Sequence, residues 1–216
     1  MKKVKYLLFI CILMLCIASG CDRKEPQENK PDDKTVAIVV GDYKVMLDEA
    51  KYYVYNSQAT YELYFLSEGK EINWNGYMRD NIIWEDGVKG FALSSMSRRE
   101  FFYGLRDKYN VSFTVEEKDK IDRTVEDFFK ESSDIIKNKI SISKERLKYV
   151  VEKKEIATKV EDIINAAKDK EADKMYLRWL ETSVCRGEEC WENIHFNDHI
   201  ITKEDVSKAQ KIEGER

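Results

Sequence analysis

The chain has 216 residues, of which 36% are charged and 43% apolar, and its 37 basic and 41 acidic side chains give a net charge of −4. This excess of acid argues against nucleic acid as a partner, because phosphate binding needs a basic face. The length allows one domain with a substantial hydrophobic core.

Residues 1–20 have the composition of an export signal. Three lysines precede an apolar run from Tyr6 to Ala18, and this run of about 13 residues is shorter than the roughly 20 that a membrane-spanning helix needs. The following "IASGC" resembles a bacterial lipobox, the motif at which a signal peptidase cuts before a cysteine that carries diacylglycerol and palmitate, although Ala18 stands where leucine is commoner. We predict a signal peptide over 1–20 and lipid attachment at Cys21, with an ordinary cut near Ala18 or an uncleaved anchor as alternatives.

Residues 21–34 are predicted to comprise the lipidated cysteine and a disordered tether. Pro26 and Pro31 are the only prolines, and they stand among charged and amide side chains that cannot bury enough apolar surface to fold. Asp22 resembles the residue that retains lipoproteins at the inner membrane of enteric bacteria. The expected location is the outer face of the bacterial cytoplasmic membrane, where the N-terminal lipid holds the protein.

The first folded elements are expected directly after the tether. "TVAIVVGDYKV", residues 35–45, combines β-branched residues with a Gly41-Asp42 turn signal and predicts a β-hairpin. The apolar period then changes, and Asp48 and Glu49 stand where a helix dipole favours acid. Residues 46–66 therefore predict a helix, and its expected buried face is Ala50, Val54, Ser57, Tyr61, Tyr64 and Phe65.

A stretch punctuated by glycines separates this helix from the next. Apolar residues at helical spacing resume at Val88 and predict a second long helix that continues to Tyr109. The stretch itself, residues 68–90, predicts a loop and one short helix that carries Trp74, Tyr77, Ile83 and Trp84.

Further helices are marked by caps and by apolar spacing. Thr114 and Glu117 form a capping box ahead of a helix whose apolar pattern continues to Ile135. Another helix is predicted from near Ser143 to Ala167, and the helical pattern resumes over 175–180.

The expected fold is mostly α, with four or five helices and a small β-hairpin near the N-terminus. "TSVCRGEECWENIHF", residues 182–196, predicts one short strand, and strands near both ends of the domain favour pairing with each other. We place the helical domain at 35–200 and a polar C-terminal tail at 201–216, which starts with a capped turn from Thr202 to Asp205.

The stretch "VAIVVGDYKVMLDEAKYYVY", residues 36–55, resembles the N-terminal domain of SurA-like and PrsA-like foldase lipoproteins. The likeness continues through the later helix boundaries and covers about 35–197, although Met46 stands where the family often has a Thr or Ser cap. It implies a multi-helix SurA N-terminal-like chaperone domain. The residues that match the first strand, turn and helix start of the family are Gly41, Lys44, Val45, Asp48 and Glu49.

The same resemblance bears on activity. Full-length members of the family carry a parvulin prolyl isomerase domain after the helix that corresponds to 143–167, whereas this sequence continues directly into "INAAKDKEADKMYLRWL". The only histidines are His195 and His199, and no Gly-Gly pair occurs. The resemblance therefore implies a chaperone-like lipoprotein that binds unfolded or nascent exported polypeptides without isomerase chemistry, and thus without catalytic residues or a cofactor.

Two other functions remain open from the sequence. One is an envelope interaction module that holds a single dedicated protein partner. The other is the peptidyl-prolyl cis–trans isomerase that the family name suggests. A chaperone predicts an exposed groove that accepts unrelated clients, whereas a dedicated module predicts a flatter patch and one tight complex.

The chain is rich in aromatic residues, with 12 tyrosines, 9 phenylalanines and 4 tryptophans. Rings give a peptide-binding surface large contact area at small entropic cost. Most rings are expected in the core, and the core residues that we predict are Val54, Tyr61, Phe102, Phe128 and Ile164. Those that lie partly off the helical stripes or in the glycine-punctuated stretch are the candidates for client contact: Tyr52, Tyr55, Tyr64, Trp74, Tyr77 and Trp84.

Two residue pairs near the C-terminus are candidates for a disulfide and for a metal site. Cys185 and Cys190, in "CRGEEC", predict a disulfide across a tight turn outside the cytoplasm. His195 and His199 have the i, i+4 spacing of two metal ligands on a helix. The residues between them favour a turn, and no glutamate follows in the zinc-protease order, so we predict no metal site.

Overall fold

The computed structural model describes residues 35–40, 43–168, 170–182, 185–187, 189–202 and 204–205. All of them belong to one compact unit, Asp32–Arg216, which carries its own hydrophobic core. The predicted signal peptide, Cys21 and the tether lie outside the described residues, as does most of the polar tail. None of the described helices combines the length and the apolar composition that crossing a membrane requires.

The N-terminal hairpin is confirmed, and it is part of a three-stranded sheet. Strands β1 (Val36–Val40) and β2 (Tyr43–Met46) pair antiparallel, and β5 (Cys185–Gly187) pairs antiparallel with the other side of β1. The predicted pairing between the two ends of the domain is therefore confirmed. Ile38, Val40 and Val45 of the hairpin are fully buried, which explains why this segment is rich in β-branched residues.

Helix α2 (Leu47–Ser67) follows β2 directly and confirms the first predicted helix. Its predicted buried face is only partly right, because Ala50 and Val54 are buried whereas Tyr64 is 61% exposed. The polar residues Gln58 and Glu62 are buried instead. They can be buried because a distant segment of the chain supplies hydrogen-bond partners on this side of the helix, as described below.

The short helix predicted around Trp74 and Tyr77 is wrong. The segment forms a second hairpin from β3 (Tyr77–Arg79) and β4 (Ile82–Ile83), with Asp80 in the turn at a positive φ of 47°. Asp and Asn tolerate this left-handed conformation, so the Asp80-Asn81 pair acts as a hairpin turn signal between two short apolar runs.

The remaining helices follow the predicted order, with two changes. Helix α3 (Trp84–Gly104) begins earlier than expected and ends before Tyr109, since turns follow Gly104. Helix α4 (Val115–Glu131) ends before Ile135 because the backbone becomes extended at Ser132. A separate short helix, α5 (Asp134–Ile140), follows. The predicted capping box of Thr114 and Glu117 is confirmed, and Ser143 caps α6 (Lys144–Ala167). Helices α7 (Lys170–Thr182) and α8 (Glu189–Glu192) flank β5.

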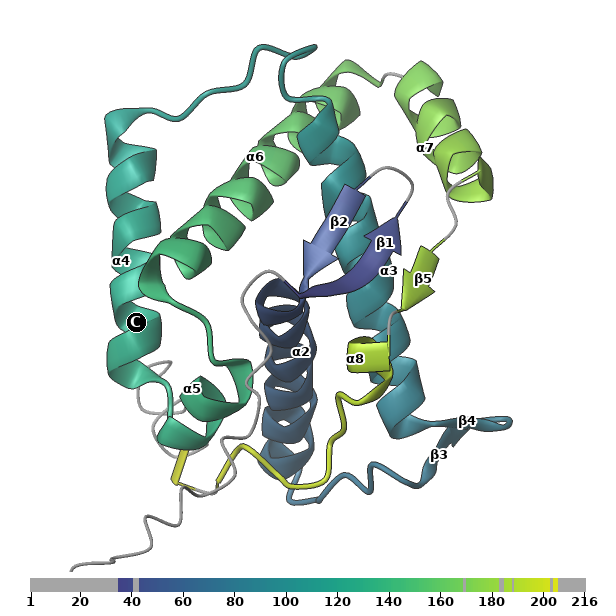
Figure 1. The fold of residues 1–216 in the computed structure, drawn as a ribbon, viewed down its shortest axis with the longest axis vertical. Helices are drawn as coiled ribbons and strands as arrows, with labels where there is room; N and C mark the ends of the chain where they lie inside the picture. The colour runs from purple at the N-terminus through teal and green to yellow at the C-terminus, as the bar shows by residue number, and fades with distance from the viewer. Residues whose placement is uncertain are drawn as a thin grey trace, which may run out of the picture. The chain divides into compact units, whose positions relative to one another are not determined.

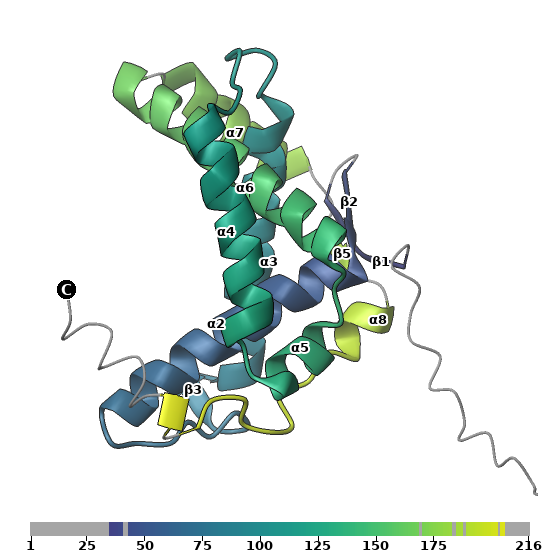
Figure 2. The same cartoon turned by 90° about the vertical axis from the view of Figure 1, so that its left-hand side faces the viewer.

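Two hydrophobic clusters hold the unit together. The larger joins α2, the N-terminal hairpin, α5 and the first part of α3. The smaller lies where the C-terminal halves of α3 and α6 meet α7, around Phe102 and Ile164 (Figures 1 and 2). Of the predicted core residues, Val54, Phe102 and Ile164 are buried, while Tyr61 and Phe128 are half-buried and pack against the larger cluster.

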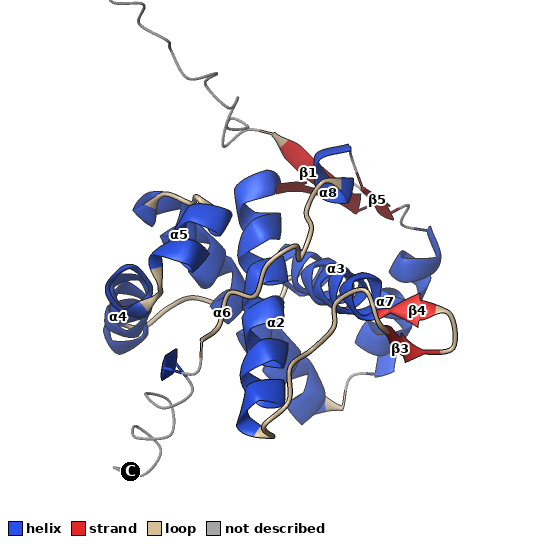
Figure 3. Cartoon of the chain, turned by 90° about the horizontal axis from the view of Figure 1, so that it is seen from below, coloured by secondary structure: helices blue, strands red, loops and turns tan. Residues whose placement is uncertain are grey.

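After α8, the chain continues without regular structure along α2 (Figure 3). We call residues 194–202 the strap. Ile194, Phe196 and Ile200 of the strap are buried in the larger cluster. The turn from Thr202 to Asp205 is capped as predicted, since each backbone N–H bonds the side chain of the other residue.

Candidate functional site

A groove of about 460 Å³ lies between α2 and α3, and residues of α6 and the strap also line it. The lining positions of α2 recur at steps of three and four along most of its length, so they form one face of the helix. The α2 residues that line the groove are Tyr52, Tyr53, Asn56, Ser57, Ala59, Thr60 and Leu63.

The α2 side of the groove presents hydrogen-bond acceptors between apolar groups. Ser57 Oγ donates to the Tyr53 carbonyl at 2.9 Å, and Thr60 Oγ1 donates to the Asn56 carbonyl at 2.8 Å. Because each hydroxyl proton is used within the helix, the lone pairs of these oxygens remain to accept hydrogen bonds. This side of the groove therefore suits a ligand that brings its own N–H donors.

The opposite side of the groove carries positive charge. The Arg99 guanidinium of α3 lies 4.5 Å from the ring centroid of Tyr53, a cation–π geometry, and Lys154 of α6 also lines the groove. The pKa of Tyr53 is raised, mainly because burial disfavours its charged form and despite the opposing charge of Arg99. Tyr53 therefore keeps its proton at neutral pH.

The structure separates the six aromatic residues predicted to contact clients. Tyr52 is half-buried and lines the groove. Tyr64 and Tyr77 are 61% and 71% exposed and lie away from it, on α2 and β3.

The other three candidates are held in aromatic contacts of the core. Tyr55 and Trp74 are buried and both pack against Phe196 of the strap, with ring centroids 6.4 and 4.6 Å away. Trp84 is half-buried against Phe65. Client contact stays a prediction for all six residues. Tyr64 and Tyr77 are exposed, so a client could reach their side chains directly.

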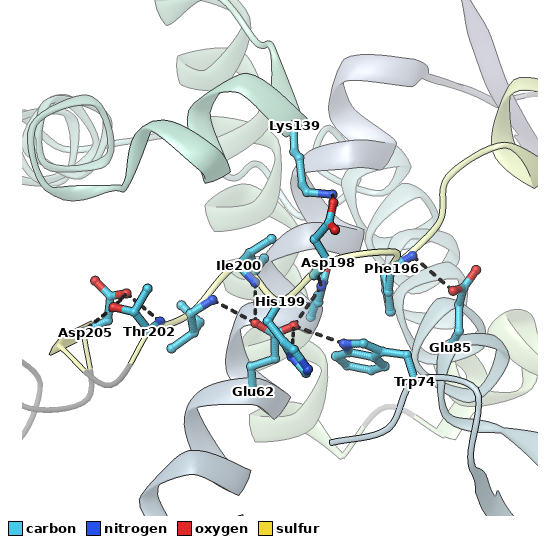
Figure 4. A network of polar contacts seen from close by, with 12 residues as sticks. Glu62, Trp74, Glu85, Lys139, Phe196, Asp198, His199, Ile200, Thr202 and Asp205 are labelled. Carbon is cyan, nitrogen blue, oxygen red and sulfur yellow. Dashed lines mark hydrogen bonds and ion pairs between the residues drawn. The ribbon is translucent and has the colours of Figure 1, made fainter. Parts of the chain in front are cut away.

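A buried carboxylate on α2 fixes the strap. Glu62 is 1% exposed, and its Oε2 accepts the backbone N–H groups of Ile200 and Ile201 at 2.7 and 2.8 Å. Its Oε1 accepts from Trp74 Nε1 at 3.0 Å and from Gln58 Nε2 at 2.8 Å (Figure 4). Such a carboxylate is stabilised by charge-assisted hydrogen bonds from donors far apart in the sequence.

A second carboxylate, Glu85 at the start of α3, holds the beginning of the strap. It accepts the Phe196 N–H at 3.0 Å, and His195 Nδ1 lies 2.9 Å from its Oε1. His199 Nδ1 lies 3.3 Å from Glu62 Oε1. The two histidines thus contact different carboxylates, and the described residues contain no group of three or more His, Cys, Asp or Glu that could hold a metal ion.

A buried ion cluster joins α2, α3 and α6. Lys153 is 3% exposed, lies 2.5 Å from Glu49 and also pairs with Glu100, while Arg146 bonds both carboxylate oxygens of Asp48 at 2.8 and 3.0 Å. Burial raises the pKa of Glu49 despite the attraction of Lys153. Burial alone would lower the pKa of Lys153, but the Glu49 and Glu100 carboxylates outweigh it and raise that pKa.

The predicted disulfide cannot be followed in the structure. The backbone of Cys185 lies in β5 opposite Val40, and that of Cys190 lies in α8, but both side chains lie outside the described residues. The disulfide between Cys185 and Cys190 stays a prediction.

The polar residues that organise the site could not be recognised from the sequence. Glu85 and Lys153 fall within charged helical stretches whose pattern is that of solvated faces, and Glu62 is a single charge in an otherwise uncharged run of α2, where nothing nearby indicates a buried partner. Arg99 and Lys154 each follow another cation, in "RRE" and "KKE", so no local signal separates the residue that lines the groove from its neighbour.

Comparisons of the chain with protein-family models, with curated proteins and with solved structures find no match.

Proposed function

We propose that the chain is a membrane-anchored extracytoplasmic lipoprotein that binds unfolded or nascent exported polypeptides in a chaperone-like manner, without covalent chemistry. The observation that carries the proposal is the open groove between α2 and α3. Its lining offers ring faces, small apolar groups, hydrogen-bond acceptors and two cations, all suited to noncovalent binding.

The groove matches the general chemistry of an unfolded chain. An extended polypeptide brings a backbone N–H donor at nearly every residue, and the oxygens of Asn56, Ser57 and Thr60 are placed to accept such donors. Tyr52 and Leu63 offer apolar contact to side chains without selecting one sequence. This combination favours many clients over one defined ligand.

The N-terminal features give the proposed binding its place. A lipid on Cys21, followed by a tether over 22–34, would keep the helical unit at the outer face of the cytoplasmic membrane, where exported chains emerge unfolded. Clients would then meet the groove before they fold or aggregate.

A dedicated protein partner is the second candidate, and one surface favours it. The β3–β4 hairpin carries the exposed side chains of Tyr77 and Ile82, and Phe91 is exposed on α3, against which this hairpin packs. Exposed apolar side chains of this kind are a common mark of protein interfaces.

The proposal is tested by filling the groove. Residues 22–216, which contain the whole described unit, are expected to slow the aggregation of several unrelated exported proteins diluted from denaturant. Ser95 lines the groove, whereas its neighbour Ser94 is exposed and does not. We expect Ser95→Trp to weaken client binding about tenfold, a loss of about 1.4 kcal/mol, and Ser94→Trp to bind as the wild type does.

Three results would argue against the chaperone function. The wild type could fail to slow aggregation of any client, or it could bind a single protein tightly and ignore all others. Alternatively, Ser95→Trp could retain full activity while circular dichroism shows that both variants are folded.

A further inference from the structure

The groove contains two half-buried cations, Arg99 and Lys154, for which the described residues supply no acidic partner. Within the described part of the chain, neither Arg99 nor Lys154 has a carboxylate within ion-pair distance, although each is half-buried. Their immediate neighbours differ, because Arg98 pairs with Glu161 at 2.5 Å and Lys153 is held by two carboxylates. Arg98 and Lys153 therefore form ion pairs, whereas their neighbours Arg99 and Lys154 line the groove.

Tyr53, which also lines the groove, has a buried hydroxyl group without a partner among the described residues. Tyr53 is 7% exposed, and its hydroxyl makes no hydrogen bond to any described residue. A buried O–H that lacks an acceptor is unfavourable, because it has lost its hydrogen bond to water and gained none in the protein. Because burial raises the pKa of Tyr53, the group remains a donor. An acceptor supplied by a ligand would relieve this cost.

The acidic groups near the groove are not among the described residues that line it. Glu155 acts on Tyr52 through its charge but lines a different pocket, next to Lys159 between α4 and α6. Glu49, near Tyr53, is bound to Lys153. None of the described residues that line the groove carries a carboxylate. The local charge of the groove is thus positive, although the chain as a whole carries a net charge of −4.

We infer that Arg99, Lys154 and the Tyr53 hydroxyl form a binding site for a side-chain carboxylate of the client, so that the groove prefers segments that carry aspartate or glutamate. This inference rests on the proposed function, because that function makes the ligand a polypeptide. An Arg–carboxylate contact in a half-buried site is stronger than a neutral hydrogen bond and supplies the preference. The net negative charge of the chain would not attract acidic peptides by itself, so a preference must come from a local site.

The test measures binding of fluorescein-labelled peptides to residues 22–216 by fluorescence anisotropy. The peptides share one extended sequence with alternating apolar residues, and their other positions are Asp and Glu, or Asn and Gln. Both ends are blocked, so that only side-chain carboxylates differ. A third peptide, neutral and with a free C-terminus, asks whether a chain end is recognised instead.

We expect the wild type to bind the acidic peptide about tenfold more tightly than its neutral twin. The double variant Arg99→Gln/Lys154→Gln should bind both peptides equally, at the affinity that the wild type has for the neutral one. A matched control, Lys118→Gln/Arg123→Gln, removes the same charge from two exposed positions of α4 and should keep the preference.

Tyr53→Phe gives a separate readout of the hydroxyl. It should lower affinity for the acidic peptide about fivefold and leave the neutral peptide unaffected. It should not lower the midpoint of urea unfolding, because it removes a hydroxyl that has no partner among the described residues.

The outcomes separate this inference from the proposed function. Equal binding of the acidic and neutral peptides by the wild type would overturn the carboxylate site and leave the chaperone function standing. A preference that survives in Arg99→Gln/Lys154→Gln, or that appears only for the free C-terminus, would overturn it too. No binding of any peptide would reject the proposed function and the inference together.

Discussion

The buried ion cluster and the groove differ in whether their cations form ion pairs, although residues of α2, α3 and α6 contribute to both. In the cluster, Lys153 is nearly inaccessible and is held between Glu49 and Glu100. In the groove, Arg99 and Lys154 are half-buried and have no acidic partner in the described residues. The two lysines are neighbours in α6, so a rotation of about 100° around one helix separates the two environments.

From this difference we expect the ion cluster to contribute mainly to stability and the groove cations to contribute mainly to ligand binding. Removing a buried charge whose partners are all present lowers the free energy of unfolding strongly, because the opposite charges stay buried without a partner. A half-buried charge without a partner contributes little to folding and is free to contact a ligand. Substitutions on the two sides of α6 should therefore affect different measurements.

The largest expected effect tests the two neighbouring lysines directly. Lys153→Met keeps the volume of the side chain but leaves Glu49 and Glu100 buried without their cation, so we expect a loss of about 4 kcal/mol in the free energy of unfolding. Lys154→Met should change it by less than about 0.5 kcal/mol. Urea unfolding followed by circular dichroism measures both.

Equal unfolding free energies for Lys153→Met and Lys154→Met would contradict this distinction between the cluster and the groove. They would mean that the ion cluster opens to water more easily than its burial indicates. Lys154→Met should also bind acidic peptides more weakly, and an unchanged affinity would place the ligand away from α6.

The strap provides a second test, with a somewhat smaller effect. Glu62→Ala removes the acceptor for two backbone N–H groups, the Trp74 indole and the Gln58 amide, and we expect a loss of about 3 kcal/mol. We expect this loss to be smaller than that of Lys153→Met, because Glu62→Ala frees neutral donors, whereas Lys153→Met leaves two buried carboxylates without their cation. Hydrogen exchange of the Ile200 and Ile201 amides should accelerate together with this loss.

An exposed ion pair serves as the control for the strap. Glu126 pairs with Lys144, and both side chains are more than half exposed, so Glu126→Ala should change stability by less than about 0.5 kcal/mol. If Glu62→Ala costs no more than this, the strap is not held by the carboxylate, and its apolar contacts alone fix it.

Local patterns were enough to predict most elements of the fold. The capping box at Thr114 and the cap at Ser143 depend on residues within one turn, and the N-terminal hairpin depends on a turn signal between two apolar runs. The second hairpin was missed because its strands are only three and two residues long, too short to show an alternating pattern.

The polar organisation of the site could not be predicted in the same way. Glu62 meets Ile200 across 138 positions, and Lys153 meets Glu100 across 53, so the sequence near each residue carries no sign of its partner. Helical periodicity assigns charged residues to solvent, and this assumption fails where a distant segment supplies donors or an opposite charge. The same failure misplaced Tyr64, since the buried side of α2 turned toward Gln58 and Glu62.

The smallest expected effect is a pH dependence that distinguishes the cluster from the surface. Burial raises the pKa of Glu49 above the ordinary 4.5, so the folded protein binds this proton more tightly than the unfolded chain does. The stability that this proton contributes is complete below pH 4.5 and is lost as the pH rises through the raised pKa. Glu49→Gln cannot titrate, and at neutral pH its stability should lie within about 1 kcal/mol of the wild type because Lys153 keeps Glu100.

The measurement is the unfolding free energy of the wild type minus that of Glu49→Gln, from about pH 3 to about pH 8. This difference should fall as the pH rises above 4.5 and should then level off. Glu117 on the surface provides the opposite sign, because its bond to Lys159 lowers the pKa of its carboxyl. Its contribution is present above pH 4.5 and is lost as the pH falls through the lowered pKa. If the difference for Glu49→Gln rises with pH, as we expect for Glu117→Gln, then the attraction of Lys153 outweighs the effect of burial on the pKa of Glu49. The charges of the cluster would then stabilise the fold.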